Sequence, residues 1–179
     1  MNPLKQYNIG FVGLSLGKHE FSFRIDESFF SCFDYSEVSK GNLSLELLLE
    51  KQNNMLVFDF LIKGNVELIC DHCLEPYQQD IEDERRLYVK FGDAFSEQTD
   101  EIVVIPVGES HFDVSQFVYE YITLALPMQR IHSEDGIVGK GCDPAITDKL
   151  NQYLGGKKPA SGERENSPWD ALKGLKFND

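Results

Sequence analysis

Alternation of hydrophobic and polar positions dominates the first two thirds of the chain and predicts β-strands. In residues 19–25 every second side chain is apolar, and residues 42–50 repeat this period with leucines. A period of two places the apolar side chains on one face of a half-buried strand. Residues 55–70 read as part of a hairpin or meander that follows a turn at 51–54. The further strand candidates are 77–92 and 101–107.

A helical period replaces the strand period at residues 113–127, where one amphipathic helix is predicted. Asp113 is the expected N-cap, Gln116 is at the capping-box position, and Pro127 marks the end. Strands followed by a helix indicate an α+β fold, in which one long amphipathic helix packs on an antiparallel sheet. The apolar stripe of that helix consists of Val114, Phe117, Val118, Tyr121, Ile122 and Ala125.

After Pro127 the chain becomes irregular, with a short helix expected over 145–154. We therefore assign residues 1–154 to one α+β domain. Residues 155–166 contain almost no apolar side chain and are predicted to be a flexible linker. Ser167 and Pro168 are favourable first residues of a helix, so a short C-terminal helix is expected over 167–179. It would dock on the domain or on a partner.

Charge narrows the range of partners. The formal net charge of −13 is concentrated in residues 1–139, where 24 acidic and ten basic side chains give a balance of −14. Such a surface repels a phosphate backbone, so general nucleic-acid binding is not expected. The acids serve solubility or meet a basic partner such as a ribosomal protein. No apolar run could span a membrane, and no signal peptide is evident, so a cytoplasmic protein is expected. The sequence does not indicate an oligomeric state.

Four cysteines raise the question of a metal site. Cys70 and Cys73 form a C-x-x-C turn, which can direct two thiolates at one ion. The later residues soft enough to complete zinc ligation are His132, Cys142 and His111, and His132 with Cys142 would complete a tetrahedral set. The alternative is a set of free thiols. The remaining cysteine, Cys32, is interpreted as a small buried apolar residue.

Redox catalysis is the competing use of a C-x-x-C sequence, and it requires a stabilised thiolate. Asp71 and Glu75 flank the turn, and negative neighbours raise the pKa of a thiol. The pair is therefore interpreted as a structural knuckle. No nucleophile elbow, phosphate-binding loop or metalloprotease motif is present, so neither an enzyme nor a small-molecule substrate is expected.

Three segments in order resemble the YceD family of large ribosomal RNA subunit accumulation proteins. Residues 64–82 resemble its glycine, strand, C-x-x-C and following strand, although His72 stands where many relatives have arginine. Residues 113–132 resemble its acidic helix with a Leu-Ala-Leu-Pro ending, and residues 167–177 resemble its C-terminal motif. Relatives carry a denser cysteine cluster after the Leu-Pro segment, where this chain has Cys142 with His132 nearby.

The resemblance implies a non-enzymatic role in large-subunit rRNA accumulation, through binding of an rRNA precursor, a ribosomal protein or a processing factor. The alternatives are a zinc-stabilised structural or nucleic-acid-binding module with another role, and a thiol oxidoreductase. The candidate contact residues for a partner are Lys157, Lys158, Arg164 and Trp169.

Overall fold

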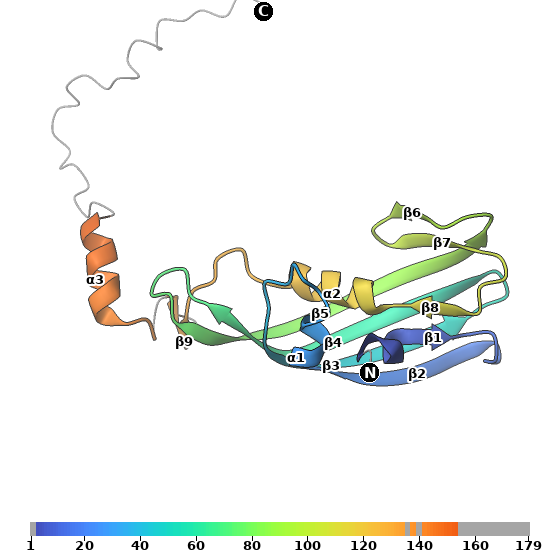
Figure 1. Cartoon of the computed structure of the whole chain (residues 1–179), viewed down its shortest axis with the longest axis horizontal. Helices are drawn as coiled ribbons and strands as arrows, with labels where there is room; N and C mark the ends of the chain where they lie inside the picture. The colour runs from blue at the N-terminus through green and yellow to red at the C-terminus, as the bar shows by residue number, and fades with distance from the viewer. Residues whose placement is uncertain (1–2, 135–136, 139–140, 154–179) are drawn as a thin grey trace, which may run out of the picture.

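A computed structural model describes residues 3–134, 137–138 and 141–153. Its centre is a six-stranded sheet in the order β2-β3-β4-β5-β7-β6 (Figure 1). All neighbours in this sheet are antiparallel except β5 and β7, which are parallel. The strands are β2 (Gly17–Ile25), β3 (Gly41–Lys51), β4 (Met55–Ile69), β5 (Pro76–Gly92), β6 (Ser96–Thr99) and β7 (Ile102–Pro106).

The strand predictions are confirmed, and the α+β class is correct. The sheet is antiparallel as expected in all but one of its strand pairs. The exception arises because the chain leaves β5, forms β6 at the edge and returns as β7 between them. β7 therefore runs in the same direction as β5, with Tyr88 opposite Ile102. Along β4 the ladder is continuous from Met55 to Ile69, so the sequence there forms one long strand.

One face of the sheet carries the main core. In β3 the leucines at positions 43, 45, 47 and 49 are all buried, whereas the side chains between them are exposed or half-buried. Their partners on β4 include Ile62, Phe60 and Phe58, which are buried on the same face. The alternation read from the sequence therefore corresponds to one buried and one outward face.

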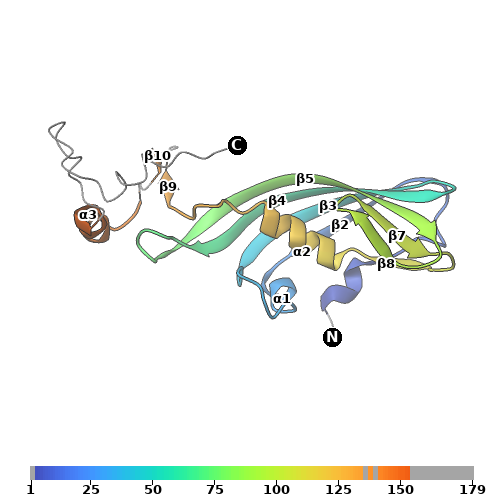
Figure 2. The same ribbon diagram turned by 90° about the horizontal axis from the view of Figure 1, so that it is seen from above.

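Short elements cover that inner face. The 3-10 helix η1 (Pro3–Tyr7) leads into β1 (Asn8–Gly10), which pairs with β8 (His111–Asp113) in a separate two-stranded sheet. Helices α1 (Glu27–Phe30) and α2 (Ser115–Leu124) complete the layer. Seen from above, these elements lie on the inner side of the arched sheet, and no described element covers the opposite face (Figure 2).

Helix α2 is shorter than expected, with ten residues, and its predicted capping box is wrong. Val114 is the N-cap and makes no side-chain cap bond, although Asp113 Oδ1 accepts the Ser115 N–H at 2.9 Å. Asp113 belongs to β8, where it pairs with Asn8, and this extended pairing prevents an earlier helix start. The Gln116 side chain donates to Tyr35 and Glu120 instead of reaching back to the cap.

Strands β4 and β5 extend beyond the rest of the sheet as a two-stranded ribbon. Pairing of β3 with β4 ends at Val66, whereas pairing of β4 with β5 continues to Ile69 opposite Pro76. The C-x-x-C turn therefore lies at the tip of a projection from the main domain (Figure 1).

Near this tip lie the remaining elements, β9 (Ser133–Glu134), β10 (Ile137–Val138) and helix α3 (Pro144–Tyr153). The short helix expected over 145–154 is confirmed. The predicted linker 155–166, the predicted helix 167–179 and the candidate contact residues lie outside the described residues. Among the described helices, none combines the length and apolar character needed to cross a membrane.

Gly64 is the position at which the close pairing of β4 with β3 can be tested, because its backbone lies against that of β3. Its φ is +143°, and an added Cβ would lie 2.2 Å from the Asn42 carbonyl oxygen. We expect Gly64→Ala to reduce the free energy of unfolding by about 2–4 kcal/mol, since it combines backbone strain with a backbone clash. Urea unfolding followed by circular dichroism would measure this loss.

Gly13→Ala is the matched control, because nothing lies within 4 Å of the added Cβ. A change within about 0.5 kcal/mol is expected for this exposed turn. Equal losses for the two variants would contradict the assigned role of Gly64.

Candidate metal centre

The knuckle is a tight turn closed by backbone hydrogen bonds. The Cys70 N–H donates to the Glu75 carbonyl, and the Leu74 N–H donates to the Cys70 carbonyl, both at 2.9 Å. Leu74 has a positive φ of 62°, which reverses the chain directly after Cys73. The His72 N–H points at Cys70 Sγ at 3.4 Å. The turn therefore closes on itself and leaves both sulfurs available on its inner side.

A backbone clamp brings the second pair of residues to the turn. The Asp71 N–H donates to the Arg130 carbonyl at 2.6 Å, and Asp71 Oδ2 accepts the Arg130 N–H at 2.9 Å. The Arg130 guanidinium also pairs with Glu37. The segment after α2 is thereby fixed along the ribbon tip, and His132 follows two residues later.

The four predicted ligands come together. Cys70, Cys73, His132 and Cys142 each offer one ligand atom, and these atoms lie within 4.8 Å of one another. Cys70 Sγ and Cys142 Sγ are 3.7 Å apart, and Cys73 Sγ is 3.4 Å from His132 Nδ1. Zn–S bonds of about 2.3 Å in a tetrahedron place two sulfurs about 3.8 Å apart, and a sulfur and a nitrogen about 3.6 Å apart. The donor set and its spacing therefore fit zinc.

These ligands form a small cluster separate from the main core. Cys70, Cys73 and Cys142 are 0%, 3% and 8% exposed, and the main core of the domain does not include them. Three partly buried side chains pack around them, namely Tyr77, Ile131 and Ile146, and Tyr77 also packs against the main core. The Tyr77 ring meets the His132 ring edge-to-face at a centroid distance of 5.0 Å, which limits rotation of the imidazole.

Helix α3 is tied to this cluster through its first turn. It begins two residues after Cys142, and Asp143 Oδ1 accepts the Ala145 N–H at 2.8 Å. Ile146, the third residue of the helix, contacts the cysteine cluster. A bound ion would therefore join the ribbon tip, the segment after α2 and the start of α3.

The expected effect of the acidic neighbours on the thiols is wrong for Cys70. Burial by itself raises the pKa of this thiol, but the backbone N–H groups of Cys73, His132 and His72 outweigh burial and lower the pKa. Asp71 directs its carboxylate at the Arg130 backbone. Burial and the neighbouring thiols raise the pKa of Cys142. Such N–H groups aimed at a sulfur favour the thiolate form that a metal ion binds.

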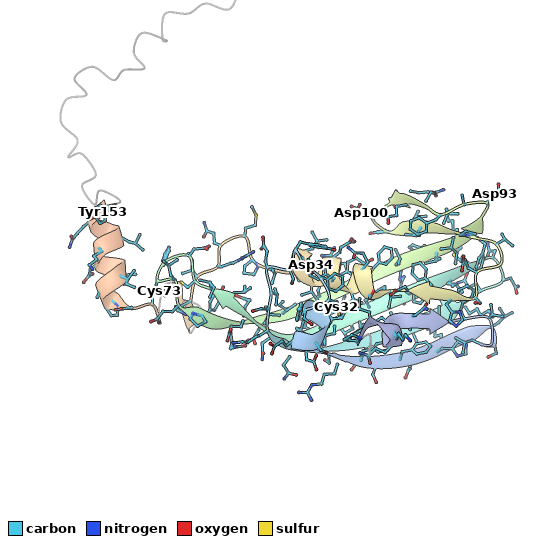
Figure 3. The ribbon with its side chains drawn as sticks, in the orientation of Figure 1. Cys32, Asp34, Cys73, Asp93, Asp100 and Tyr153 are labelled. Atoms are coloured by element: carbon cyan, nitrogen blue, oxygen red, sulfur yellow. The ribbon has the colours of Figure 1, made fainter. Side chains whose placement is uncertain are left out.

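The other candidates lie apart from this centre. Cys32 is half-exposed rather than buried, and its thiol donates to the Ser28 carbonyl at 3.3 Å. It lies beside α1 on the main domain, whereas Cys73 is at the ribbon tip (Figure 3). His72 is half-buried and does not belong to the four-ligand set. The structure does not describe Lys157, Lys158, Arg164 or Trp169.

Sequence analysis missed the residues that assemble and shield the centre. Asp71 and Arg130 are 59 positions apart, and neither belongs to a motif that indicates their pairing. Tyr77 and Ile146 follow the knuckle and Cys142 at short range. An apolar residue four positions after Cys73 and another four positions after Cys142 are the signal that could have suggested a shielding layer.

Comparison with known proteins identifies the family. The family model described as "Large ribosomal RNA subunit accumulation protein YceD" matches residues 58–176. This range includes all four candidate ligands. No curated protein matches the chain, and no solved structure does.

Protein purified without a chelator is expected to contain one equivalent of zinc, measured by elemental analysis. Cys142→Ser should lower the affinity for zinc at least about 100-fold, since even outer-shell changes cost 10–100-fold. Cys32→Ser is the control and should retain full occupancy. Less than about a tenth of an equivalent in the unaltered protein would contradict a zinc centre.

Metal removal should loosen the ribbon tip without unfolding the domain, because the two clusters share no buried residue and Tyr77 is the partly buried side chain that packs against both. Hydrogen exchange with a strong chelator is expected to deprotect the amides of Asp71 and Leu74, whereas the amides of Leu45 and Leu47 stay protected. Loss of protection at all four amides would show that the main core depends on the metal.

Proposed function

The chain belongs to the family of large ribosomal RNA subunit accumulation proteins, and we propose that it is a non-enzymatic ribosome-biogenesis factor of the cytoplasm. It would support large-subunit rRNA by binding a basic ribosomal protein or a processing factor, or by local contact with an rRNA precursor. The observation that carries this proposal is the family match over residues 58–176.

The proposed metal centre supports a structural role rather than a catalytic one. Four protein ligands fill a tetrahedral zinc site, so no coordination position remains for water or substrate. The bound ion would act as a cross-link between three segments of the chain. The knuckle then serves to position surfaces, which is consistent with a binding factor.

Charge supports a protein partner over a general RNA contact. The net charge is −13, and the acidic side chains are concentrated in residues 1–139. Such a surface attracts the lysine- and arginine-rich chains of ribosomal proteins and repels phosphate. Any direct RNA contact would then fall on the weakly basic residues 140–179, which include Lys157, Lys158 and Arg164, with Trp169 as an aromatic contact. A nucleic-acid-binding zinc module with another role is the alternative that this charge balance disfavours.

A thiol oxidoreductase is the second alternative, and the lowered pKa of Cys70 is the observation that favours it. Its burial argues against it, because Cys70 is 0% exposed and Cys73 is 3% exposed. Reactive catalytic thiols are usually partly accessible to their substrates. We therefore place this function below the binding role.

Depletion of the protein in its host cell tests the proposal. Large-subunit rRNA is expected to fall relative to small-subunit rRNA, and a plasmid-borne copy should restore the ratio. Quantitative electrophoresis of total RNA measures it. An unchanged ratio after complete depletion would contradict the proposed function.

A plasmid-borne copy with Cys70→Ser and Cys73→Ser distinguishes the binding role from the thiol oxidoreductase. Partial restoration of the rRNA ratio is expected, because the main core does not require these residues. Disulfide-exchange activity that is present in the unaltered protein and lost in this variant would favour the oxidoreductase.

A further inference from the structure

The outward face of the sheet contains a broad hollow of about 1100 Å³. Residues of β2, β3, β4 and β5 line it. The outward side chains among them lie on the face of the sheet that no described element covers, and Figure 2 shows that face opposite α1 and α2. Four strands with a spacing of about 4.8 Å are about 14 Å across, and an α-helix with side chains is about 10–12 Å wide. The hollow is therefore wide enough for an extended or helical segment of another chain.

The floor of this hollow includes apolar side chains on a face where polar ones are expected. Leu48 is opposite Asp59 on the neighbouring strand, which makes Leu61 its diagonal neighbour. Both leucines are half-buried and line the hollow, as does Tyr88 on β5. An outward leucine pair on an uncovered sheet gains stability if a second apolar surface covers it.

Acidic side chains surround these leucines. Glu20 lies opposite Leu48, Glu46 lies opposite Leu61, and Glu84 lies opposite Leu61 on the other side. None of these three carboxylates forms an ion pair with another side chain in the described part of the chain. Asp59 is instead paired with Arg86, whose Nη2 lies 3.1 Å from Asp59 Oδ2.

The lining as a whole is negative. Its charged residues are five acidic and two basic. Arg85 lies opposite the inward-facing Phe60 and holds its guanidinium 6.0 Å from the centre of the Tyr121 ring, so Arg86 is the basic group on the outward side. The charged residues that line the hollow are Glu20, Glu46, Asp59, Glu84, Glu101, Arg85 and Arg86.

We propose that this hollow is the docking site for a lysine- or arginine-rich amphipathic segment of a partner protein. The basic side chains would pair with Glu20, Glu46 and Glu84, and the apolar ones would cover Leu48 and Leu61. That the segment is basic and amphipathic is inferred from the residues that line the hollow. That it belongs to a large-subunit protein rests on the proposed function.

Charge complementarity favours this occupant over the others. RNA phosphates would meet a lining in which carboxylates outnumber basic groups. A second copy would place one acidic face against the same acidic face, which is repulsive. The residues 155–179 of this chain carry five basic and four acidic side chains, so their attraction to the hollow is weak.

Titration of the full-length protein with a synthetic 20-residue peptide tests the site. The peptide carries lysine, arginine and leucine at helical spacing, and binding is followed by calorimetry and by amide chemical shifts. Shifts should concentrate on β2 to β5 around Leu48 and Leu61, and affinity should fall as salt is added. Shifts spread evenly over all acidic regions would overturn the proposal.

Two charge-matched variants separate the site from general attraction. Glu20→Gln, Glu46→Gln, Glu84→Gln should lower the affinity about tenfold, at roughly threefold or less per exposed pair. The control changes Glu97→Gln, Asp100→Asn and Glu109→Gln, which lie in β6, directly after β6 and after β7 and do not line the hollow. The control should change affinity less than twofold, and equal losses would refute a defined site.

The floor is tested separately with Leu48→Thr, Leu61→Thr, because threonine retains the preference for strands. Weaker binding with an unchanged salt dependence is expected, since the variant removes apolar contact and keeps every charge. Unchanged affinity would show that the leucines are not part of the site.

Zero-length carbodiimide cross-linking identifies the occupant. Without peptide, the glutamates of the hollow should remain unlinked, and with peptide they should join its lysines. Links to Lys157 or Lys158 of the same molecule would assign the hollow to the chain's own C-terminal part. Links between two copies would assign it to a dimer. Either result would overturn the proposal.

Cells that carry the Glu20, Glu46, Glu84 variant distinguish the two conclusions. The variant is expected to restore large-subunit rRNA less well than the charge-matched control. If depletion lowers large-subunit rRNA and both variants restore it fully, the proposed docking site is contradicted and the proposed function is retained. If depletion leaves the rRNA ratio unchanged, the function fails regardless of peptide binding.

Discussion

The antiparallel ladder between β4 and β5 is the constraint on which the rest of the structure depends. It joins fifteen residue pairs without a break, from Met55 opposite Lys90 to Ile69 opposite Pro76. The part from Met55 to Val66 belongs to the sheet that carries the main core, and the last three pairs, from Glu67 to Ile69, carry the cysteine turn away from that core. Gly64 permits this continuity where β4 passes close to Asn42 of β3. One hairpin therefore determines both the core and the position of the candidate metal centre.

Two stabilising principles operate at the two ends of this hairpin. The inner end relies on apolar burial, with leucines and phenylalanines interlocked across β3 and β4. The tip buries few apolar side chains, and its centre consists of three thiols and one imidazole. A short ribbon with a helix attached through Ile146 has little core of its own, and a bound ion can supply the missing connection.

The two faces of the sheet also differ in what covers them and in the side chains they carry. The inner face is covered by α1, α2 and the β1–β8 pair, whereas the outward face carries leucines among unpaired carboxylates. Carboxylates on an exposed sheet favour solubility and discourage self-association. Those around Leu48 and Leu61 make the same face selective for a basic partner. This arrangement connects the strong acidity of residues 1–139 to the proposed role beside basic ribosomal proteins.

The strands, the α+β class and the four candidate ligands could be predicted from the amino-acid sequence, because they depend on local period and on side-chain chemistry. Leu43 to Leu49 alternate as a half-buried strand must, and few residues other than His132 and Cys142 could complete a soft-ligand set. The tertiary structure alone decided the parallel β5–β7 pairing and the late start of α2, which depends on Asp113 pairing with Asn8. It also decided the Asp71–Arg130 clamp and the outward hollow. These features join residues far apart in sequence, and no local pattern encodes which distant backbone groups will meet.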